Sequence, residues 1–217
     1  MAGMPAASGR SLSAWPKDAL RIGFGIIWLI DAILKWLPGF RSGYMDTIMG
    51  QAQDQPGWLK PWFDFWINLQ HPRAAFFAYL VAAVETLIAL ALIAGFARKL
   101  TYISAATFSL LIWATAEGFG GPYTSGSADI GTAVIYAVVF AGFLALSAYA
   151  GPARYSADYY LEKKIPWWWK VAEVRRPAAE QPAQAAAPAN TPTLTPAAVP
   201  QPRAAGPTQS AEPAAHR

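Results

Sequence analysis

Cysteine is absent from this sequence, and histidine occurs only twice, as His71 and His216. Without thiols, the chain makes no disulfide, no thiolate metal site and no iron–sulfur cluster of its own. The single histidine outside the terminal segment does not supply bis-histidine haem ligation or a three-histidine metal site. We therefore expect no metal, haem or iron–sulfur cofactor held by this chain alone.

Charge is also scarce, because only 14% of the 217 residues are charged, whereas soluble domains usually carry about 25%. Hydrophobic residues make up 54% of the sequence, and the mean hydropathy is positive. These residues occur in long runs rather than at helical or strand spacing. Both features predict that the chain lies in lipid.

Four apolar stretches are predicted to be membrane-spanning helices, at about 19–38, 74–97, 99–117 and 130–150. Each is close to the roughly 20 residues that a helix needs to cross about 30 Å of hydrocarbon. The first is closed by Pro38-Gly39 and follows a leader, residues 1–18. The sequence therefore predicts an all-α membrane protein, a four-transmembrane-helix bundle over residues 19–150.

The basic residues predict the orientation of this bundle. They precede the first span, form the turn between the second and third, and follow the fourth: Arg10, Lys17, Arg21, Arg98, Lys99, Arg154, Lys163, Lys164, Lys170, Arg175 and Arg176. The cytoplasmic flanks of membrane helices collect Lys and Arg. We expect a multi-pass protein of the plasma or inner membrane with both termini cytoplasmic and residues 39–73 and 118–129 outside.

Three further segments are distinguished by composition. Aromatic and aliphatic residues recur at helical spacing over 58–69, which predicts an amphipathic helix, either an interfacial anchor or a lid. Residues 151–176 combine Tyr and Trp with Lys and Arg, which suits the headgroup layer of the bilayer. Residues 177–217 are rich in Ala and Pro and are predicted to be a disordered cytoplasmic tail.

Charged residues inside the predicted spans are the main functional signal. A charge near the bilayer centre costs roughly 2.5–3.5 kcal/mol, so those that persist usually have partners and a role. Asp31 and Glu85 fall near mid-membrane, and Glu117 and Asp129 lie at the outer ends of their spans. These four acids are the candidate catalytic residues. The structural alternative is an Asp31–Lys35 salt bridge, a Glu85 hydrogen bond between helices, and helix capping by the other two.

The stretch from Trp113 to Tyr123, W-A-T-A-E-G-F-G-G-P-Y, followed by D-I-G-T at 129–132 and I-Y-A at 135–137, resembles the DoxX/DoxD family of membrane proteins. The second span, with V-E-T-L-I at 84–88, Gly95 and the turn Arg98-Lys99, is similar to that family too. The resemblance covers residues 18–150 and implies a four-helix membrane fold. Some members are the membrane subunit of thiosulfate:quinone oxidoreductase, which oxidises thiosulfate to tetrathionate and passes electrons to quinone. Others are associated with oxidative-stress and sulfur-handling partners.

Together these features predict an integral membrane subunit of a quinone-linked oxidoreductase that acts on thiosulfate or another reduced sulfur compound. The four acids would exchange protons with quinone, the diffusible acceptor. The ring of the quinone would pack in an apolar pocket of Trp113, Phe119, Tyr123 and Tyr136. An oxyanion would be held by Lys35 with Arg41 or Arg73. Either the substrate meets quinone directly, or a second redox subunit or a homo-oligomer completes the site.

Two other functions remain open. One is a non-enzymatic membrane scaffold that recruits a redox or stress-response partner through residues 155–176 and the tail. The other is a solute or proton conduit, although no internal repeat or broken central helix favours it. Nucleic-acid binding is not expected, because the basic residues follow membrane topology rather than a surface patch.

Overall fold

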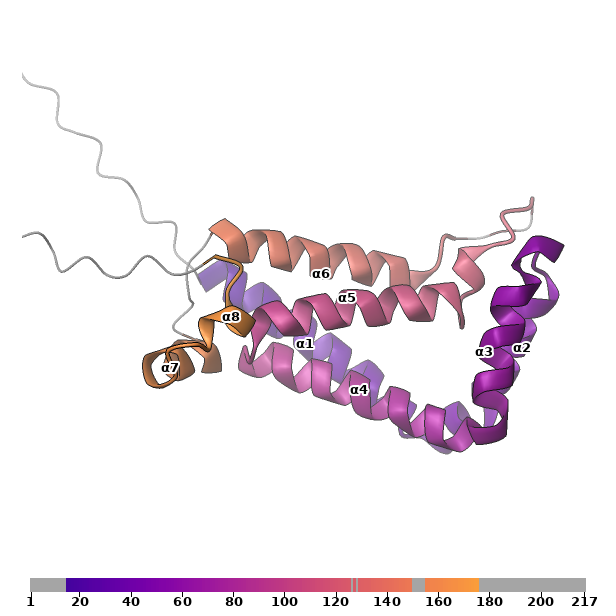
Figure 1. The fold of residues 1–217 in the computed structure, drawn as a ribbon, viewed down its shortest axis with the longest axis horizontal. Helices are drawn as coiled ribbons and strands as arrows, with labels where there is room; N and C mark the ends of the chain where they lie inside the picture. The colour runs from indigo at the N-terminus through magenta and orange to yellow at the C-terminus, as the bar shows by residue number, and fades with distance from the viewer. Residues whose placement is uncertain (1–14, 126, 128, 150–154, 176–217) are drawn as a thin grey trace, which may run out of the picture. The chain divides into compact units, whose positions relative to one another are not determined.

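The computed structural model describes residues 15–125, 127, 129–149 and 155–175, all within one compact unit, residues 1–177. Within these described ranges the chain forms helices and turns and no strand, so the all-α prediction is confirmed. The predicted tail and most of the predicted leader lie outside the described residues. Four long helices run along the unit, and shorter ones cross its two ends (Figure 1).

The long helices are α1 (Trp15–Lys35), α4 (Ala74–Ala94), α5 (Arg98–Ala114) and α6 (Thr132–Tyr149). As helices they coincide with the four apolar stretches of the sequence, with shifted ends. α1 packs mainly on α4, and α5 packs mainly on α6. Gly25 allows the closest approach of α1 to α4, because a Cβ there would lie 3.1 Å from the backbone nitrogen of Ile93. Small residues let helix backbones approach closely in this way.

An aromatic cluster joins the two helix pairs. The ring of Phe24 on α1 lies 5.4 Å from Phe140 and 5.9 Å from Tyr136 on α6, and Trp28 lies 5.0 Å from Phe140. Tilted and edge-on pairs at such separations are the favoured geometry for aromatic side chains. Buried Ile88, Ala89, Leu92, Tyr102, Ala105 and Phe143 complete this core.

One end of the bundle is crossed by an antiparallel helix pair, α2 (Pro38–Gln53) and α3 (Lys60–Gln70) (Figure 1). Short turns flank α3, namely η1 (Gly57–Leu59) and η2 (His71–Arg73). α3 coincides with the predicted amphipathic helix and buries Phe63. The sequence analysis placed α2 in a loop. It begins at Pro38, whose ring suits a first helical position, and it buries Met45 and Ile48.

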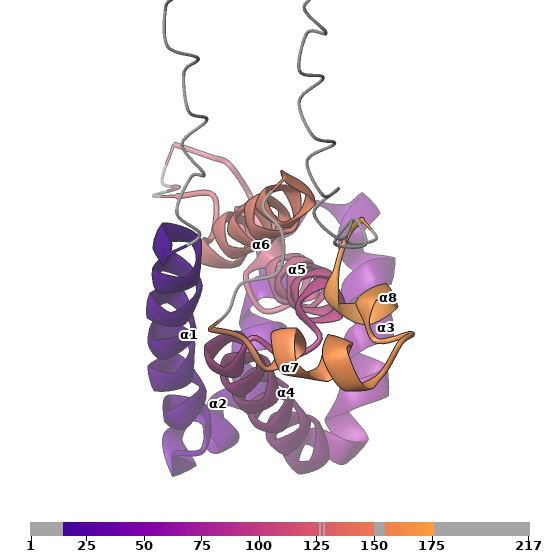
Figure 2. The ribbon, with the colours of Figure 1, turned by 90° about the vertical axis from the view of Figure 1, so that its left-hand side faces the viewer.

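The opposite end carries α7 (Ala157–Lys164) and α8 (Trp169–Ala172), which pack beside the start of α5 (Figures 1 and 2). Ser156 caps α7, because its hydroxyl oxygen accepts a hydrogen bond from the backbone N–H of Tyr159 at 3.3 Å. A third short turn, η3 (Gly118–Gly120), lies between α5 and α6.

Among the described residues, one helical run is long and apolar enough to cross a membrane by length and composition. This is Gly57–Ala94, with a mean hydropathy of 2.3 over its best 18-residue window. α6 is apolar but shorter, with Thr132–Ala148 as its apolar part. α1 carries Asp18, Arg21, Asp31 and Lys35, and α5 has 17 residues with several polar side chains. The all-helical architecture and one membrane-competent run are therefore established.

Candidate functional site

Asp31, Lys35 and Glu85 form a charged cluster between α1 and α4, which we call the acid–lysine triad. The Lys35 ammonium lies 2.8 Å from Asp31 Oδ2 and 3.4 Å from Glu85 Oε2. Lys35 and Asp31 meet because residues four apart share one helix face. Glu85 joins them because α1 and α4 are antiparallel and bring its position beside the end of α1. Asp31 and Glu85 therefore lie at a similar level along the α1–α4 pair.

The triad is graded in exposure. The side chain of Asp31 is 45% exposed, that of Lys35 is 21% exposed and that of Glu85 is 2% exposed. Asp31 lies on a helix face whose neighbours Ile27, Ile30 and Leu34 are exposed. A carboxylate at an apolar outer surface is therefore connected through one lysine to a carboxylate in the interior.

Further contacts extend from the triad to the start of α2. Trp36 donates a hydrogen bond from Nε1 to Thr86 Oγ1 at 3.0 Å, and its ring lies 6.0 Å from that of Tyr79. Arg41 donates a hydrogen bond to the Tyr79 hydroxyl, and its guanidinium lies 5.0 Å from the Tyr79 ring centre. The Lys35 ammonium lies 5.5 Å from the centre of the Phe40 ring, so Arg41, the next residue, lies close to the triad. We call six residues the corner site, because they lie where α1, α2 and α4 meet: Asp31, Lys35, Trp36, Arg41, Tyr79 and Glu85.

Glu117 and Asp129 lie elsewhere, at the start of α6. The Glu117 carboxylate accepts a hydrogen bond from the backbone N–H of Ala133 at 2.9 Å, and so caps the helix from a distance in sequence. Asp129 Oδ1 accepts from the backbone N–H of Gly131 at 2.7 Å, in the turn that leads into α6. Among the described residues, no hydrogen bond or ion pair connects these two acids to the triad. Both acids therefore contact backbone N–H groups near the start of α6, as the structural alternative to a catalytic role expects.

Steric constraints explain why glycine occupies two positions of the turn before α6. Gly120 has φ +70°, and a Cβ there would lie 2.1 Å from the carbonyl oxygen of Ile130. Gly131 has φ +88°, and a Cβ there would lie 2.6 Å from Glu117 Oε2. The left-handed region and the lack of space both require glycine. The resulting fold of the turn brings Trp113 Nε1 within 2.7 Å of the Ile130 carbonyl oxygen, to which it donates.

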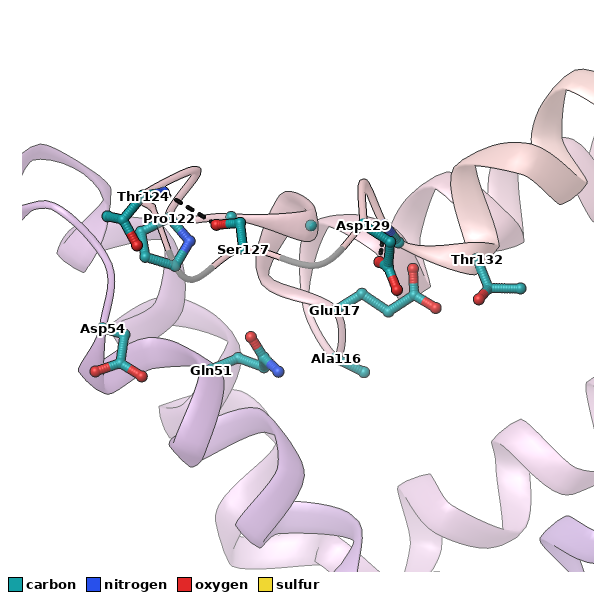
Figure 3. A pocket seen from close by; sticks show the side chains of 12 residues that line it. Gln51, Asp54, Ala116, Glu117, Pro122, Thr124, Ser127, Asp129 and Thr132 are labelled. Carbon is teal, nitrogen blue, oxygen red and sulfur yellow. Dashed lines mark hydrogen bonds between the residues drawn. The ribbon is translucent and has the colours of Figure 1, made fainter.

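A cavity of about 720 Å³ opens beside this turn. Figure 3 shows Gln51 of α2 and Asp54, which directly follows α2, on one side and Glu117, Asp129 and Thr132 on the other. Three of the lining residues are acidic and none is basic. The negative charge of its lining therefore disfavours the binding of an anion such as thiosulfate.

The aromatic residues predicted to pack a quinone ring separate into two groups. The rings of Trp113 and Phe119 lie 5.3 Å apart, and the Tyr123 hydroxyl donates to the Phe119 carbonyl oxygen. Phe119 and Tyr123 also line an apolar cavity of about 390 Å³ with Trp58 and Leu59. Tyr136 instead packs in the core, 5.1 Å from the Trp28 ring, within electrostatic range of both the triad and Glu117.

The three cations that were predicted to bind an anion do not all lie together. Lys35 lies between two carboxylates, so its charge is already balanced within the triad. Arg41 belongs to the corner site, and Arg73 is exposed at the end of η2, directly before α4. Of these three, Arg41 combines a fixed position with a place beside the triad.

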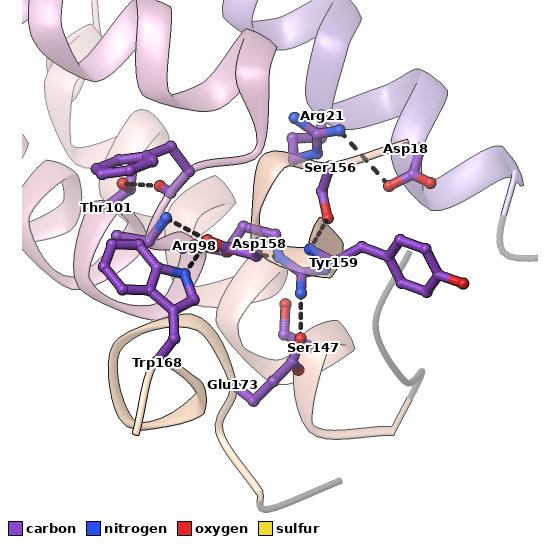
Figure 4. A network of polar contacts seen from close by, with 12 residues as sticks. Asp18, Arg21, Arg98, Thr101, Ser147, Ser156, Asp158, Tyr159, Trp168 and Glu173 are labelled. Carbon is purple, nitrogen blue, oxygen red and sulfur yellow. Dashed lines mark hydrogen bonds and ion pairs between the residues drawn. The ribbon is translucent and has the colours of Figure 1, made fainter. Parts of the chain in front are cut away.

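Sequence analysis did not find the most extensive polar cluster, which lies at the α7–α8 end (Figure 4). Asp158 is fully buried and accepts hydrogen bonds from the backbone N–H groups of Ala97 and Arg98, at 2.7 and 2.9 Å. It also accepts from Arg98 Nε at 3.0 Å and from Trp168 Nε1 at 2.8 Å. Arg98 is paired in addition with Glu173. We call these four side chains, Arg98, Asp158, Trp168 and Glu173, the Arg98 network.

Arg21 of α1 is fixed next to this network. Its guanidinium donates to the carbonyl oxygens of Leu92, Ile93 and Tyr155, and lies 3.7 Å from Asp18. The basic turn predicted to face the cytoplasm is therefore partly internal, since Arg98 is buried; Arg21, which precedes the first predicted span's apolar run, is buried too. Arg98 pairs with Asp158 and Glu173 of the 155–175 segment, but the separation of 60 or more residues hides this pairing in the sequence.

Comparison of the chain with protein-family models, with curated proteins and with solved structures found no match. The corner site is therefore argued from its own geometry.

Proposed function

We propose that the chain is a DoxX/DoxD-like, multi-pass membrane subunit of a quinone-linked oxidoreductase that acts on thiosulfate or another reduced sulfur compound. The graded exposure of the acid–lysine triad is the observation that carries this proposal. A quinone diffuses within the hydrocarbon layer, so it approaches the protein from its apolar outer surface. Asp31 is the ionisable group that this surface offers, and Lys35 and Glu85 lie behind it.

The proposed reaction transfers two electrons from the sulfur compound to quinone. Two thiosulfate ions form one S–S bond to give tetrathionate and release two electrons. Quinone takes up these two electrons and two protons to become the quinol. Both protons come from water: Asp31 passes them to the quinone oxygens, and it is reprotonated each time through Glu85 and Lys35. A positioned acid of this kind contributes typically 10²- to 10⁴-fold to a rate.

The sulfur oxyanion is assigned to Arg41 rather than to the acidic cavity at α6. An arginine binds oxyanions through parallel N–H donors, and three carboxylates would repel them. Tyr79 holds Arg41 in place, and Arg41 lies at the same meeting point of α1, α2 and α4 as the triad, so both substrates would bind at one corner of the protein. The chain alone or a second redox subunit then completes electron transfer between donor and quinone.

Substitutions at Asp31 and Glu85, the two ends of the triad, and at Arg41 test the proposed roles of these residues. Asp31→Asn and Glu85→Gln keep the side-chain shape but remove the ionisable proton, so quinone reduction is expected to fall at least tenfold. Arg41→Gln is expected to raise the KM for thiosulfate and to leave the KM for quinone unchanged. Asp64→Asn, on the exposed part of α3, is the matched control. Unchanged rates in Asp31→Asn and Glu85→Gln would remove the triad from the mechanism.

The scaffold alternative is tested by truncation, and the structure fixes where to cut. Removal of residues 155–217 would leave Arg98 buried without Asp158 and Glu173, so the bundle itself would be damaged. Truncation after Arg175 keeps the Arg98 network. A scaffold that works through the terminal segment would lose its partner on this truncation, whereas the oxidoreductase would keep its rate.

A further inference from the structure

We propose that the outward face of α7 and α8 is a docking surface for the phosphate headgroups of anionic lipids. The proposal rests on the membrane placement of the bundle and is independent of the redox chemistry. Its basis is a separation of charge within residues 155–175, where the acids face the protein and the bases face away from it.

The acids of this segment are turned inward. Asp158 is fully buried and Glu173 is buried, and both are paired with Arg98. Glu162 is half-buried, with one carboxylate oxygen shielded from solvent, and burial raises the pKa of its carboxyl group. Little negative charge therefore remains on the outer face of the segment.

The bases are turned outward. Lys163, Lys164, Lys170 and Arg175 are all exposed. Large aromatic side chains accompany them, because Tyr155, Tyr160 and Trp167 are also exposed. Lys163 lies 3.9 Å from the centre of the Tyr159 ring. A surface of cations interleaved with Tyr and Trp has the composition of the membrane–water interface, where the rings lie at the level of the headgroups.

The orientation of α7 fits the same partner. The helix is seen nearly end-on in Figure 1 and lengthwise in Figure 2, so it runs across the axis of the long helices. If the long helices span a bilayer, α7 lies parallel to its surface. The Arg98 network fixes the segment to the start of α5, so the cations are presented on a rigid support.

Lipid selectivity of the purified full-length protein tests the proposal. In neutral detergent, added phosphatidylglycerol is expected to raise the melting temperature, and phosphatidylcholine is not. Lys164→Gln/Lys170→Gln removes two exposed cations without changing the buried network. Each cation near an anionic membrane surface is worth roughly fivefold in affinity, so loss of two should weaken binding of phosphatidylglycerol roughly 25-fold.

The matched control, Lys60→Gln/Arg73→Gln, removes two exposed cations from the α2–α3 end and should bind phosphatidylglycerol as the wild type does. Equal binding by Lys164→Gln/Lys170→Gln and wild type, or equal binding of the two lipids by wild type, would overturn the proposal. A chain that stays folded and monodisperse without detergent would instead overturn the membrane placement. Quinone-reduction assays do not enter this test, so the two proposals can fail separately.

Discussion

Asp158→Asn is the substitution for which the structure predicts the largest loss of stability. The carboxylate accepts four hydrogen bonds, two from backbone N–H groups at the start of α5 and two from the side chains of Arg98 and Trp168. Asparagine offers one carbonyl oxygen, and its amide group places N–H donors opposite other donors. It also removes the negative charge that compensates Arg98 and the positive end of the α5 dipole.

The expected magnitude follows from these contacts. At least two hydrogen bonds to a charged group are lost, each worth about 1.5–3 kcal/mol. Breaking a buried ion pair by removing one partner costs about 3–5 kcal/mol, much of it from the charge left behind. We therefore expect a loss of about 3–5 kcal/mol, which corresponds to a decrease in Tm on the order of 10 °C for a chain of this length.

The assay is thermal unfolding of the purified protein in detergent, followed by tryptophan fluorescence and by limited proteolysis within 155–175. Asp64→Asn, the same change at an exposed position of α3, is the control and should leave the Tm unchanged within about 2 °C. A Tm for Asp158→Asn equal to that of the control would refute the reasoning, because the Arg98 network would then not hold α7 and α8 in place.

Two further predictions concern the Arg98 network and the turn before α6. Burial raises the pKa of Glu173 from 4.5 to about 7, although Arg98 opposes this change. The folded state therefore favours the neutral carboxyl group, and stability should fall by up to about 3 kcal/mol as the pH rises from about 4.5 through 7. Unfolding measured from pH 5 to 8 should show this component in the wild type and not in Glu173→Gln; parallel profiles would contradict it. Gly120→Ala should destabilise the turn by about 2 kcal/mol or more, since it forces a Cβ against the Ile130 carbonyl oxygen at positive φ. Gly142→Ala, where a Cβ meets nothing within 4 Å, is its control in the same thermal assay.

The four long helices could be predicted because their residues are mostly apolar over about 20 positions and are bounded by charge, glycine or proline. α2 was missed because its sequence, P-G-F-R-S-G-Y-M-D-T-I-M-G-Q-A-Q, has three glycines and no regular apolar face. Contacts with α3 and α4 stabilise it instead. Tertiary packing commonly overrides local propensity in this way.

The candidate site was predictable in part. The spacing of Asp31 and Lys35 and the estimated depth of Glu85 led to a set of residues that the structure brings together. Glu117 and Asp129, the other two candidate acids, do not join that set, because both contact backbone N–H groups near the start of α6. Trp36 and Tyr79 were not predicted, since an aromatic residue near a membrane surface has no distinct local signal.

The Arg98 network could not be predicted from local pattern. Arg98 pairs with Asp158 and Glu173, which lie 60 and 75 residues further along the chain. A basic turn after an apolar helix normally indicates a cytoplasmic flank, and that interpretation used the charge of Arg98 without its partners. Only the packing of α7 and α8 against the start of α5 shows that the arginine is internal.

An anaerobic assay tests whether this chain couples a reduced sulfur donor to quinone, as we propose. Membranes that contain the protein are mixed with decyl-quinone and thiosulfate, and the absorbance of the quinone is followed with time. The account predicts reduction that requires both the protein and the donor and that is lost in Asp31→Asn. Folded protein that leaves the quinone oxidised with thiosulfate and with other reduced sulfur donors would contradict it.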